Sequence, residues 1–433
     1  MLDRADAVVI GGGILGASAA LHLIESGVTD VLLLERDGLA QGTSNAGAGF
    51  IGMWGAGYVA DWADEELEIE AYGLDFYERL AEEGYDLGFR RNGNLWATTT
   101  EEAWATHIEP LVAHPRVADK RILEPEEVEE LTGIVSAEGI LRGFLHPSGG
   151  YVSAPLATLA LADRFRRQGG RIELRRPAER IIVESERVVG VDTGQGRVEA
   201  RTVVVACGAW SGTLLGEHGI SLPMVPLVAS RIITENLHLP GTMPTIMLPE
   251  FAFIWLREEG GALLWGCDYN CFPHTAFVDA PAPERFDQLP LDGVVYTQQI
   301  GVQAAGAMPV LHRYRSMRVA HGAPCFTPDR RGIVGGAGGI EGLYVMGGCN
   351  EGGISHGPGW GKLIAELAVA GVPTNPAADA FSPGRFGGAY TSGQDVLEAL
   401  DGGWGSRAPG SSATTTDGKL AASETVPAGE RVS

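Results

Sequence analysis

Three glycines and one glutamate near the N-terminus have the types and the spacing that bind a dinucleotide. Gly11, Gly13 and Gly16 follow one apolar run, and Glu35 closes the next. The first glycine permits a tight turn, the second lets a pyrophosphate approach the backbone, and the third lets a helix pack closely on the sheet. The N–H groups of a helix that begins near Ile14 are free to hold phosphates. The Glu35 carboxylate suits ribose hydroxyls and repels the 2′-phosphate of NADP, so the motif predicts FAD or NAD.

These residues need two parallel strands with a helix between them. Residues 6–10 and 31–34 are apolar throughout, as buried parallel strands are. Apolar spacing and end signals predict further helices over 65–83, 124–132, 154–168 and 358–370. Short strands are predicted over 93–98, 171–174, 179–183, 188–191 and 203–206, and residues 225–320 alternate as an antiparallel sheet does.

The order of these elements predicts an α/β protein with a second domain inserted into the first. A Rossmann-like parallel-sheet domain takes residues 1–60, 150–215 and 325–387, and an α+β substrate or cap domain with an antiparallel sheet takes 61–149 and 216–324. Residues 403–433 are rich in Ser, Thr, Ala and Gly with few large apolar side chains, which predicts a disordered tail.

The composition narrows the partners and the compartment. A formal net charge of −23 disfavours nucleic acids and anionic membranes as partners. No apolar run is long enough to cross a membrane, and the first strand begins too early for a signal peptide. The five cysteines are an odd number without metal-ligand spacing, so we expect no metal and a reducing, cytoplasmic location.

Several segments, taken in order, resemble the D-amino-acid oxidase, glycine oxidase and sarcosine oxidase superfamily of FAD-dependent oxidoreductases. The pattern is most similar to dimethylglycine and sarcosine oxidases and dehydrogenases, and it covers residues 1–387. Besides the glycine motif, the segments that carry it are GTSNAG at 42–47, VVVACGAW at 203–210, FTPDRRGIVG at 326–335, GLYVMG at 342–347, SHGPGWGK at 355–362 and FSPGRF at 381–386. The resemblance implies an FAD-binding domain of the glutathione-reductase type.

The resemblance also implies which residues hold FAD. The ADP half is held by Gly13, Ile14, Glu35 and Arg36; Thr43, Ser44, Gly47 and Ala48 run beneath the flavin; and Asn350, Glu351, Gly352, Gly353 and Ile354 face its pyrimidine edge. The set also includes Gly11, Gly16, Asn45 and Gly208. A helix that begins near Gly357 would stabilise negative charge on the reduced flavin with its positive end.

One difference from the family pattern predicts how FAD is attached to the protein. Some relatives carry a His just after the Thr-Ser pair that links covalently to the flavin, whereas here Asn45 occupies that place. FAD is therefore predicted to be non-covalent. Monomeric sarcosine oxidases use a Cys instead, and Cys325 lies a few residues from the corresponding place. A Cys325 thioether is thus the alternative, and a small buried apolar residue is the other interpretation of this cysteine.

The basic residues that usually clamp a substrate carboxylate in this family are missing from their expected places. Those places hold Pro324 and Glu351. Because a buried carboxylate without a partner is costly, we expect an amine without a small α-carboxylate, or a larger amino compound, as the substrate. Arg231, Arg257 and Arg313 from the predicted antiparallel sheet are the alternative clamp.

Candidate catalytic residues are His356, Trp255 and Tyr269. His356 begins the helix beside the flavin, where it is either a base or hydrogen-bond donor, or a structural cap. An aromatic cage suits a cationic amine, and a core or surface role is the alternative for each of its members. The candidate cage residues are Trp54, Tyr58, Trp255 and Tyr269. Glu351 is a candidate partner for the substrate ammonium.

Together these features predict an enzyme that uses FAD to oxidise a C–N bond of an amine or N-alkyl amino compound to an imine or iminium. O2 is the expected acceptor, giving H2O2. The Lys that promotes the oxygen reaction in sarcosine oxidases corresponds to Leu264, and a catalytic His of dimethylglycine oxidases to Ala229. A dehydrogenase subunit that passes electrons to a protein or a quinone is therefore the first alternative. A flavin-bearing structural subunit is the second.

Overall fold

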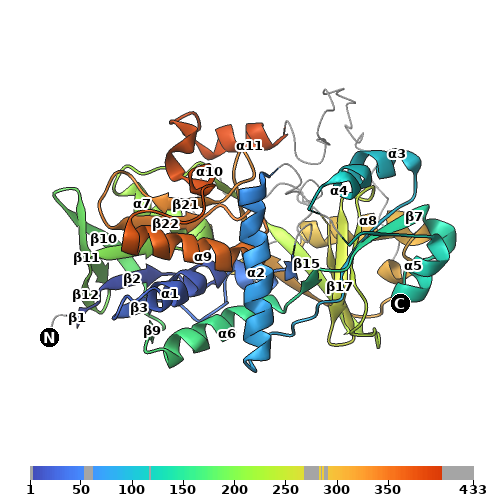
Figure 1. Ribbon diagram of the computed structural model, residues 1–433, viewed down its shortest axis with the longest axis horizontal. Coiled ribbons are helices and arrows are strands. Elements are labelled where there is room, and N and C mark those ends of the chain that lie inside the picture. The colour runs from blue at the N-terminus through green and yellow to red at the C-terminus, as the bar shows by residue number, and fades with distance from the viewer. Residues whose placement is uncertain are drawn as a thin grey trace, which may run out of the picture.

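The computed structural model describes residues 3–52, 62–116, 119–267, 282–283, 285–286 and 291–401. Trp54, Tyr58, Tyr269, Cys271 and the predicted tail lie outside these residues. The chain forms two parts that lie side by side along the long axis, with helix α2 (Asp64–Glu82) across the middle (Figure 1).

The first part is built on a six-stranded sheet that is parallel except at one edge. In spatial order its strands are β21 (Ile333–Gly336), β22 (Leu343–Gly347), β13 (Thr202–Val205), β2 (Ala7–Ile10), β3 (Val31–Leu34) and β9 (Arg171–Glu173). Only β21 runs antiparallel to its neighbour. Strands β2 and β3 are buried along their whole length, because both faces of the sheet are covered.

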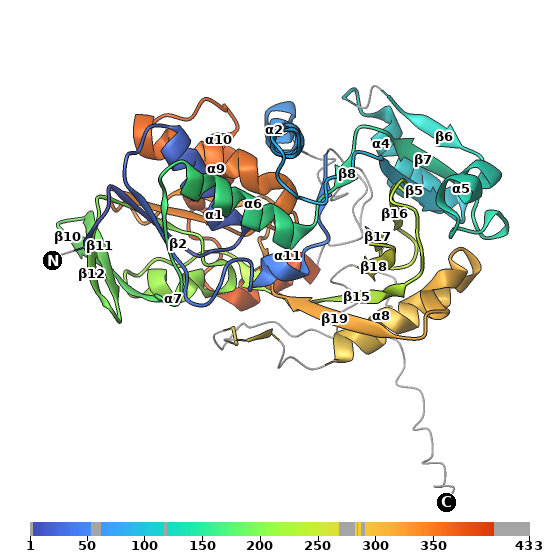
Figure 2. The same cartoon turned by 90° about the horizontal axis from the view of Figure 1, so that it is seen from below.

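The two faces of this sheet are covered by different layers. Alternate side chains such as Val9 and Leu33 pack against helices α1 (Ile14–Glu25), α6 (Ala154–Arg167) and α9 (Gly353–Ala370), which lie together on one side (Figure 2). The intervening side chains, such as Val8 and Leu32, pack against a second sheet. That sheet has the order β1 (Asp3–Arg4), β12 (Gly196–Glu199), β11 (Arg187–Thr193) and β10 (Ala178–Glu184). The predicted α/β, Rossmann-like fold class is confirmed.

The second part is built on a mixed eight-stranded sheet. In spatial order its strands are β19 (Met317–Gly322), β15 (Ala229–Asn236), β18 (Ala262–Gly266), β17 (Ile254–Glu259), β16 (Thr245–Leu248), β5 (Asn94–Thr98), β7 (Arg142–His146) and β6 (Arg121–Leu123). Neighbours are antiparallel except β16 and β5, which are parallel. The substrate domain expected from the sequence thus has its sheet, assembled from two separate stretches of chain.

Helix α8 (Asp292–Gln303) covers one face of the eight-stranded sheet, within the range that was predicted as strands alone. Its buried Val294 and Ile300 pack with Ile232 of β15 and Trp265 of β18. The prediction missed this helix because the alternating pattern around it was extended through it. The opposite face of the sheet turns toward the first part of the molecule.

Helices α2 and α9 pack against each other, although α2 falls in the range predicted for the substrate domain. Helix α9 begins at Gly353, earlier than the predicted start at residue 358. Pro358 inside the helix has no N–H, so the carbonyl of Ile354 lacks its usual partner. The hydroxyl of Tyr77 on α2 donates a hydrogen bond of 2.9 Å to that carbonyl. This contact lets the helix continue through the proline.

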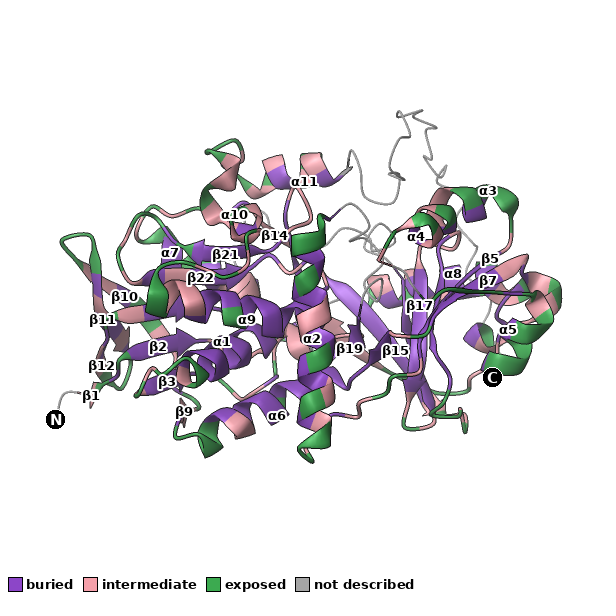
Figure 3. Cartoon of the chain, viewed as in Figure 1, coloured by how far each residue is buried: buried purple, intermediate pink, exposed green. Residues whose placement is uncertain are grey.

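Shorter elements complete the described part of the fold. The remaining helices are α3 (Glu101–Ala103), α4 (Glu109–Ala113), α5 (Pro125–Thr132), α7 (Ser211–Gly216), α10 (Ala378–Phe381) and α11 (Gly393–Asp401). Two-residue strands pair β4 (Phe50–Ile51) with β8 (Gly150–Tyr151), and β14 (Val225–Pro226) with β20 (Cys325–Phe326). Buried residues follow the strands, and exposed residues gather on outer helices and turns (Figure 3). Within the described residues, we find no helix with the length and apolar character needed to cross a membrane.

Candidate active site

The glycine motif forms the junction between β2 and α1, and two of its glycines leave no room for a side chain. Gly11 has a φ of 115°, and a Cβ there would lie 2.4 Å from the carbonyl oxygen of Ala206. A Cβ on Gly16 would lie 1.8 Å from the carbonyl oxygen of Gly11. A Cβ on Gly13 would meet the hydroxyl of Ser44 at 3.1 Å. Gly11 and Gly16 hold the turn together, and Gly13 faces a polar opening.

Polar side chains from two other segments reach this opening. Glu35 accepts hydrogen bonds from the N–H groups of Gly12 at 2.6 Å and Asp37 at 2.7 Å. The hydroxyl of Ser44 accepts a hydrogen bond of 2.9 Å from the N–H of Ile14, in the first turn of α1. The structure therefore brings together the glycine motif, the acid after β3 and the Thr-Ser loop, as the sequence predicts.

The loop of residues 43–48 runs from this opening to the eight-stranded sheet. The hydroxyl of Thr43 accepts a hydrogen bond of 3.0 Å from the N–H of Ala323. A Cβ on Gly47 would lie 2.9 Å from Cβ of Ala154 at the start of α6, so the loop passes close to that helix. Asn45 is exposed, and Ala48 offers its carbonyl to Arg257. The loop thus connects the two parts of the molecule.

Arg36, which follows Glu35, and Gly208, in the turn after β13, both lie near Trp210. The guanidinium of Arg36 lies 4.7 Å from the centre of the Trp210 ring. Gly208 has a φ of 55° and begins the short turn that carries Trp210. Trp210 in turn stacks on Phe286, with ring centres 5.2 Å apart. The ring of Trp210 therefore packs on neighbouring side chains.

The turn before α9 reaches the same opening from the C-terminal side. Asn350 and Glu351 have left-handed φ angles of 46° and 68°. Asn350 is buried, and its side-chain oxygen accepts a hydrogen bond of 2.9 Å from the N–H of Thr327. A Cβ on Gly353 would lie 3.6 Å from Cγ2 of Ile14, so the N-termini of α1 and α9 lie side by side. Buried hydrogen bonds hold the unusual backbone in place, a combination common at binding sites.

His356 lies in the core beyond this turn. It is 1% exposed, and its Nε2 lies 3.2 Å from a carboxylate oxygen of the fully buried Glu70 on α2. Its ring packs against Trp62 and Trp360, with centroids 4.9 Å and 4.8 Å away. His356 does not line the pocket described next.

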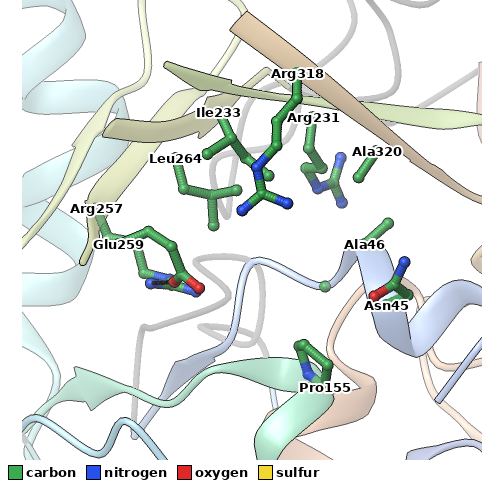
Figure 4. Close-up of a pocket in the computed structure, with 11 residues that line it drawn as sticks. Asn45, Ala46, Pro155, Arg231, Ile233, Arg257, Glu259, Leu264, Arg318 and Ala320 are labelled. Carbon is green, nitrogen blue, oxygen red and sulfur yellow. Dashed lines mark ion pairs between the residues drawn. The ribbon is translucent and has the colours of Figure 1, made fainter. Parts of the chain in front are cut away.

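A pocket opens between the loop at 45–47 and the eight-stranded sheet (Figure 4). Pro155 at the start of α6 closes one side. The sheet contributes Arg231, Ile233, Arg257, Glu259, Leu264, Arg318 and Ala320. These residues alternate along four neighbouring strands, because every second side chain points away from α8. Three arginines against one glutamate make this wall positive in a chain whose net charge is −23.

Arg231 is buried in this wall and has an acidic partner from the cofactor side. Its guanidinium lies 3.0 Å from a carboxylate oxygen of Glu351 and 4.6 Å from the centre of the Trp255 ring. A Cβ at Gly266 would come within 2.5 Å of the Trp255 ring, so this glycine lets the indole lie across the neighbouring strand. The predicted residues Trp255, Arg231 and Glu351 therefore meet in one cluster.

Arg257 is also committed to partners inside the protein. Its side chain is 2% exposed, forms an ion pair with Glu259 and donates hydrogen bonds to the carbonyls of Ala48 and Glu258. The guanidinium also lies 4.7 Å from the centre of the Tyr151 ring. Arg257 thus ties the sheet to the loop beneath the expected flavin.

Arg318 is the pocket arginine that was not predicted from the sequence, whereas the predicted Arg313 is exposed and does not line the pocket. The alternation of Arg318, Ala320 and Gly322 along β19 was available as a signal that these residues share a face. The pairing of β19 with β15, which places that face over the loop at 45–47, was not.

The described cysteines are free thiols; Cys267 and Cys325 are buried, and Cys207 and Cys349 are half-buried. Burial raises the pKa of the Cys325 thiol well above its usual range, with a smaller contribution from Cys349 nearby. Burial also raises the pKa of Cys349 to about 11. Because the thiolate is the reactive form, this environment disfavours a bond to Cys325.

The residues around the opening fit FAD. The N-cap residues of α1 and α9 are Gly13 and Gly352, which offer no side-chain cap, and neither helix has an acidic residue in its first turn. Their N–H groups and positive ends are therefore suited to an anionic ligand. Gly13 leaves the space that a Cβ would fill, and Glu35 offers a carboxylate beside it. Two helix N-termini, a polar loop and an acid, which an FAD site uses, therefore lie close together here.

The fold and this site define a class of flavoprotein oxidoreductases. The family model of FAD dependent oxidoreductases, DAO, matches residues 6–367. The chain belongs to this family, whose members bind FAD, typically without a covalent link.

Individual relatives agree with this assignment. The chain is 31% identical to 4-methylaminobutanoate oxidase (formaldehyde-forming) of Paenarthrobacter nicotinovorans, over 84% of this chain and 44% of the relative. It is 28% identical to the mitochondrial dimethylglycine dehydrogenase of Rattus norvegicus, over 89% of this chain and 45% of the relative. The chain thus spans less than half the length of these two relatives. The structure of L-proline dehydrogenase from P. horikoshii superposes with a TM-score of 0.77 at 20% identity, covering 90% of this chain and 99% of that one, which shows a shared fold.

Proposed function

We propose that this protein oxidises the C–N bond of an amine or N-alkyl amino compound with FAD. The observation that carries the proposal is the pocket between the loop at 45–47 and the eight-stranded sheet, next to the FAD-binding surface. The substrate loses two electrons and two protons to give an imine, which water hydrolyses to a carbonyl compound and an amine. O2 takes up the two electrons and two protons to give H2O2. When bound, FAD supplies the two-electron acceptor that no side chain can provide.

The chain's own residues position the reactants. Gly11 and Gly16 fix the turn that presents the N–H groups of α1, and the loop at 43–48 brings the cofactor surface up to the sheet. The Trp255 ring and the Arg231–Glu351 pair form one cluster beside the pocket, and we propose that the amine end of the substrate lies against it. The apolar Ile233 and Leu264 reduce the water around the reacting carbon.

The substrate must lose its ammonium proton before the C–N bond is oxidised. Glu259 is the only carboxylate among the described residues that line the pocket, and it is paired with Arg257. We therefore assign no protein base to this step, and the proton passes to solvent. His356 is buried against Glu70, so we propose that it positions α9. Trp255 remains the proposed substrate contact, while Tyr269 lies outside the described residues.

The names of the two relatives support an N-methylated substrate. One is named for 4-methylaminobutanoate and for forming formaldehyde, and the other for dimethylglycine. Hydrolysis of an imine formed at an N-methyl carbon releases formaldehyde.

A reducing compartment such as the cytoplasm is part of the same proposal, because the described cysteines are all unpaired thiols.

Anaerobic bleaching of the bound flavin tests the proposal. The purified, FAD-loaded chain is mixed with primary, secondary and tertiary amines of similar size, and absorbance at the flavin band is followed. N-methyl amines should bleach the flavin, and admission of O2 should restore it with one H2O2 per amine oxidised. If no amine in the panel bleaches the flavin, the proposal is wrong and a structural flavin-bearing subunit becomes the better description.

A second candidate is a dehydrogenase that passes electrons to a protein or a quinone. Leu264 lines the pocket at the place where the family resemblance expects the Lys that promotes the oxygen reaction. An apolar side chain gives no positive charge to stabilise reduced oxygen. Rapid bleaching followed by slow reoxidation in air, but fast reoxidation by an artificial quinone, would favour this candidate.

A further inference from the structure

The pairing of four strands sets the arginines of the pocket in a defined order. Arg318 on β19 pairs with Ile233 on β15, which pairs with Leu264 on β18, which pairs with Arg257 on β17. Directly paired residues share a face, so these four side chains form one row across the sheet. Neighbouring strands lie about 4.8 Å apart, which places Arg318 and Arg257 at opposite ends of a row about 14 Å long.

Further strand pairs show how far each arginine lies from the loop of residues 43–48, called the cofactor loop below. Gly322 pairs with Ala229, and a Cβ on Gly322 would lie 3.1 Å from Cγ2 of Thr43. Arg231 pairs with Ala320 in the next row, which we call the inner row. Arg318 belongs to the row after that, which we call the outer row. A strand rises about 3.3 Å per residue, so Arg318 lies about 13 Å along β19 from the loop contact, with Arg231 about halfway.

The three arginines of the pocket differ in whether an acidic side chain balances their charge. Arg231, in the inner row, is balanced by Glu351, and Arg257 is balanced by Glu259. Arg318, in the outer row, is exposed and forms no ion pair with any residue in the described part of the chain. A small α-amino acid would have to place its carboxylate beside its reacting carbon, where Arg231 already holds Glu351. The cation available to a ligand is therefore the one farthest from the cofactor loop.

We propose that Arg318 binds the carboxylate of an extended amino acid in which several carbons separate the carboxylate from the reacting nitrogen. The amine end lies in the inner row, beside Trp255 and the Arg231–Glu351 pair, and the carboxylate lies in the outer row. This inference rests on the proposed function, and it assigns substrate length and charge to one residue. It narrows the expectation of an amine without a small α-carboxylate, or a larger amino compound, to an amino compound with a distant carboxylate.

A series of N-methylamino carboxylates tests the inference. The series has one to five methylene groups between nitrogen and carboxylate, and each member is matched by the N-methylamino primary amide of equal length. The second-order rate constant for anaerobic flavin bleaching should be at least about tenfold higher with three methylenes than with one. It should also be higher for the long carboxylates than for their matched amides.

Two variants and one control assign the effect to Arg318. Arg318→Gln should lower the rate constant for the long carboxylates by about 10- to 100-fold, as expected for the loss of a charge-assisted hydrogen bond, and should leave the amides nearly unchanged. Arg318→Lys should recover part of the loss. Arg313→Gln removes an exposed arginine that does not line the pocket, and it should change neither series.

A faster reaction with one methylene than with three, or an equal loss for carboxylates and amides in Arg318→Gln, would overturn the inference. A binding measurement separates this failure from that of the proposed function. Methylthio carboxylates of the same lengths carry sulfur in place of the N–H and are not amines, and their Kd is read from the change in flavin absorbance. If no amine bleaches the flavin, the oxidase proposal fails, while a Kd raised at least about tenfold in Arg318→Gln supports the Arg318 site and an unchanged Kd rejects it.

Discussion

The cofactor surface and the substrate pocket adjoin each other, but they are built in different ways. The cofactor surface rests on backbone: Gly11 and Gly16 are fixed by contacts that a single Cβ would break, within one strand-turn-helix unit. The pocket rests on side chains from separate strands, and its charge depends on which arginines have acidic partners. The cofactor surface therefore tolerates almost no change of shape, whereas a single change of charge alters the pocket.

The largest expected effect tests the backbone-built region. Gly16→Ala would place a Cβ 1.8 Å from the carbonyl oxygen of Gly11, so the turn must open. We expect the free energy of unfolding to fall by about 3 kcal/mol and most of the purified protein to lack FAD. Urea unfolding and the ratio of flavin to protein absorbance after gel filtration measure both effects.

Gly212→Ala is the matched control for this change. It lies in helix α7, and a Cβ there would meet no atom within 4 Å. Stability and FAD content should stay at the level of the unsubstituted protein. Full FAD content in Gly16→Ala would show that the cofactor surface is not fixed by its backbone contacts.

The next effect tests the side-chain-built region. Glu351→Gln leaves the buried Arg231 without its acidic partner, which should lower the free energy of unfolding by about 2 kcal/mol. Glu341→Gln breaks a pair with Arg187 whose side chains are 66% and 58% exposed, and it should cost less than about 0.5 kcal/mol. Urea unfolding compares the two variants.

Glu351→Gln should also change which ligands the pocket binds. Arg231 is then available for an α-carboxylate, so methylthioacetate should bind more tightly than it does to the unsubstituted protein. Equal losses of stability in the two variants, with no gain in binding, would contradict the assignment of Arg231 to Glu351.

Each of the two regions contains a histidine whose burial affects the stability of the fold at low pH. Burial lowers the pKa of His22 on α1 below its usual value of 6.5, although its hydrogen bond to the Ser18 carbonyl opposes the shift. The unfolded chain binds a proton that the folded chain does not, so stability is lost as the pH falls below about 6.5, by up to about 1.4 kcal/mol per pH unit. Burial also lowers the pKa of His321 on β19, but this residue is only half-buried.

Urea unfolding between pH 7.5 and 5.5 measures the two contributions. His22→Gln should flatten the dependence of stability on pH more than His321→Gln does. A larger flattening in His321→Gln would mean that the substrate sheet, and not the helix layer of the cofactor part, carries the acid sensitivity.

The smallest effect concerns the junction of the two regions at Cys325. Its raised pKa keeps the thiol protonated near neutral pH, so acid precipitation should release all flavin into the supernatant. Peptide mapping after iodoacetamide treatment of the native protein at pH 8 should show Cys325 unmodified, with modification appearing after unfolding. Flavin that stays with the Cys325 peptide would identify a thioether instead.

Much of the cofactor region was predictable because its residues are close in sequence. The glycine spacing, the apolar strands and Glu35 specify a local unit whose geometry follows from backbone sterics, and the structure brings Ser44 and the turn at 350–354 to the same opening. The start of α9 was predicted too late, because Pro358 is a helix breaker unless Tyr77 from another helix compensates for it. Local signals cannot report such a partner.

Local sequence signals were enough to predict the family, the FAD cofactor and the fold class, because glycine spacing and apolar periodicity act over a few residues. The charge of the pocket depends instead on contacts between distant parts of the chain. Arg231 and Glu351 are far apart in the chain, and the absence of basic residues at 324 and 351 suggested a site without a clamp. Strand register placed Arg318 at the end of the pocket far from the loop of residues 43–48, and acidic partners neutralised the other two arginines. Register depends on long-range pairing that no short segment encodes.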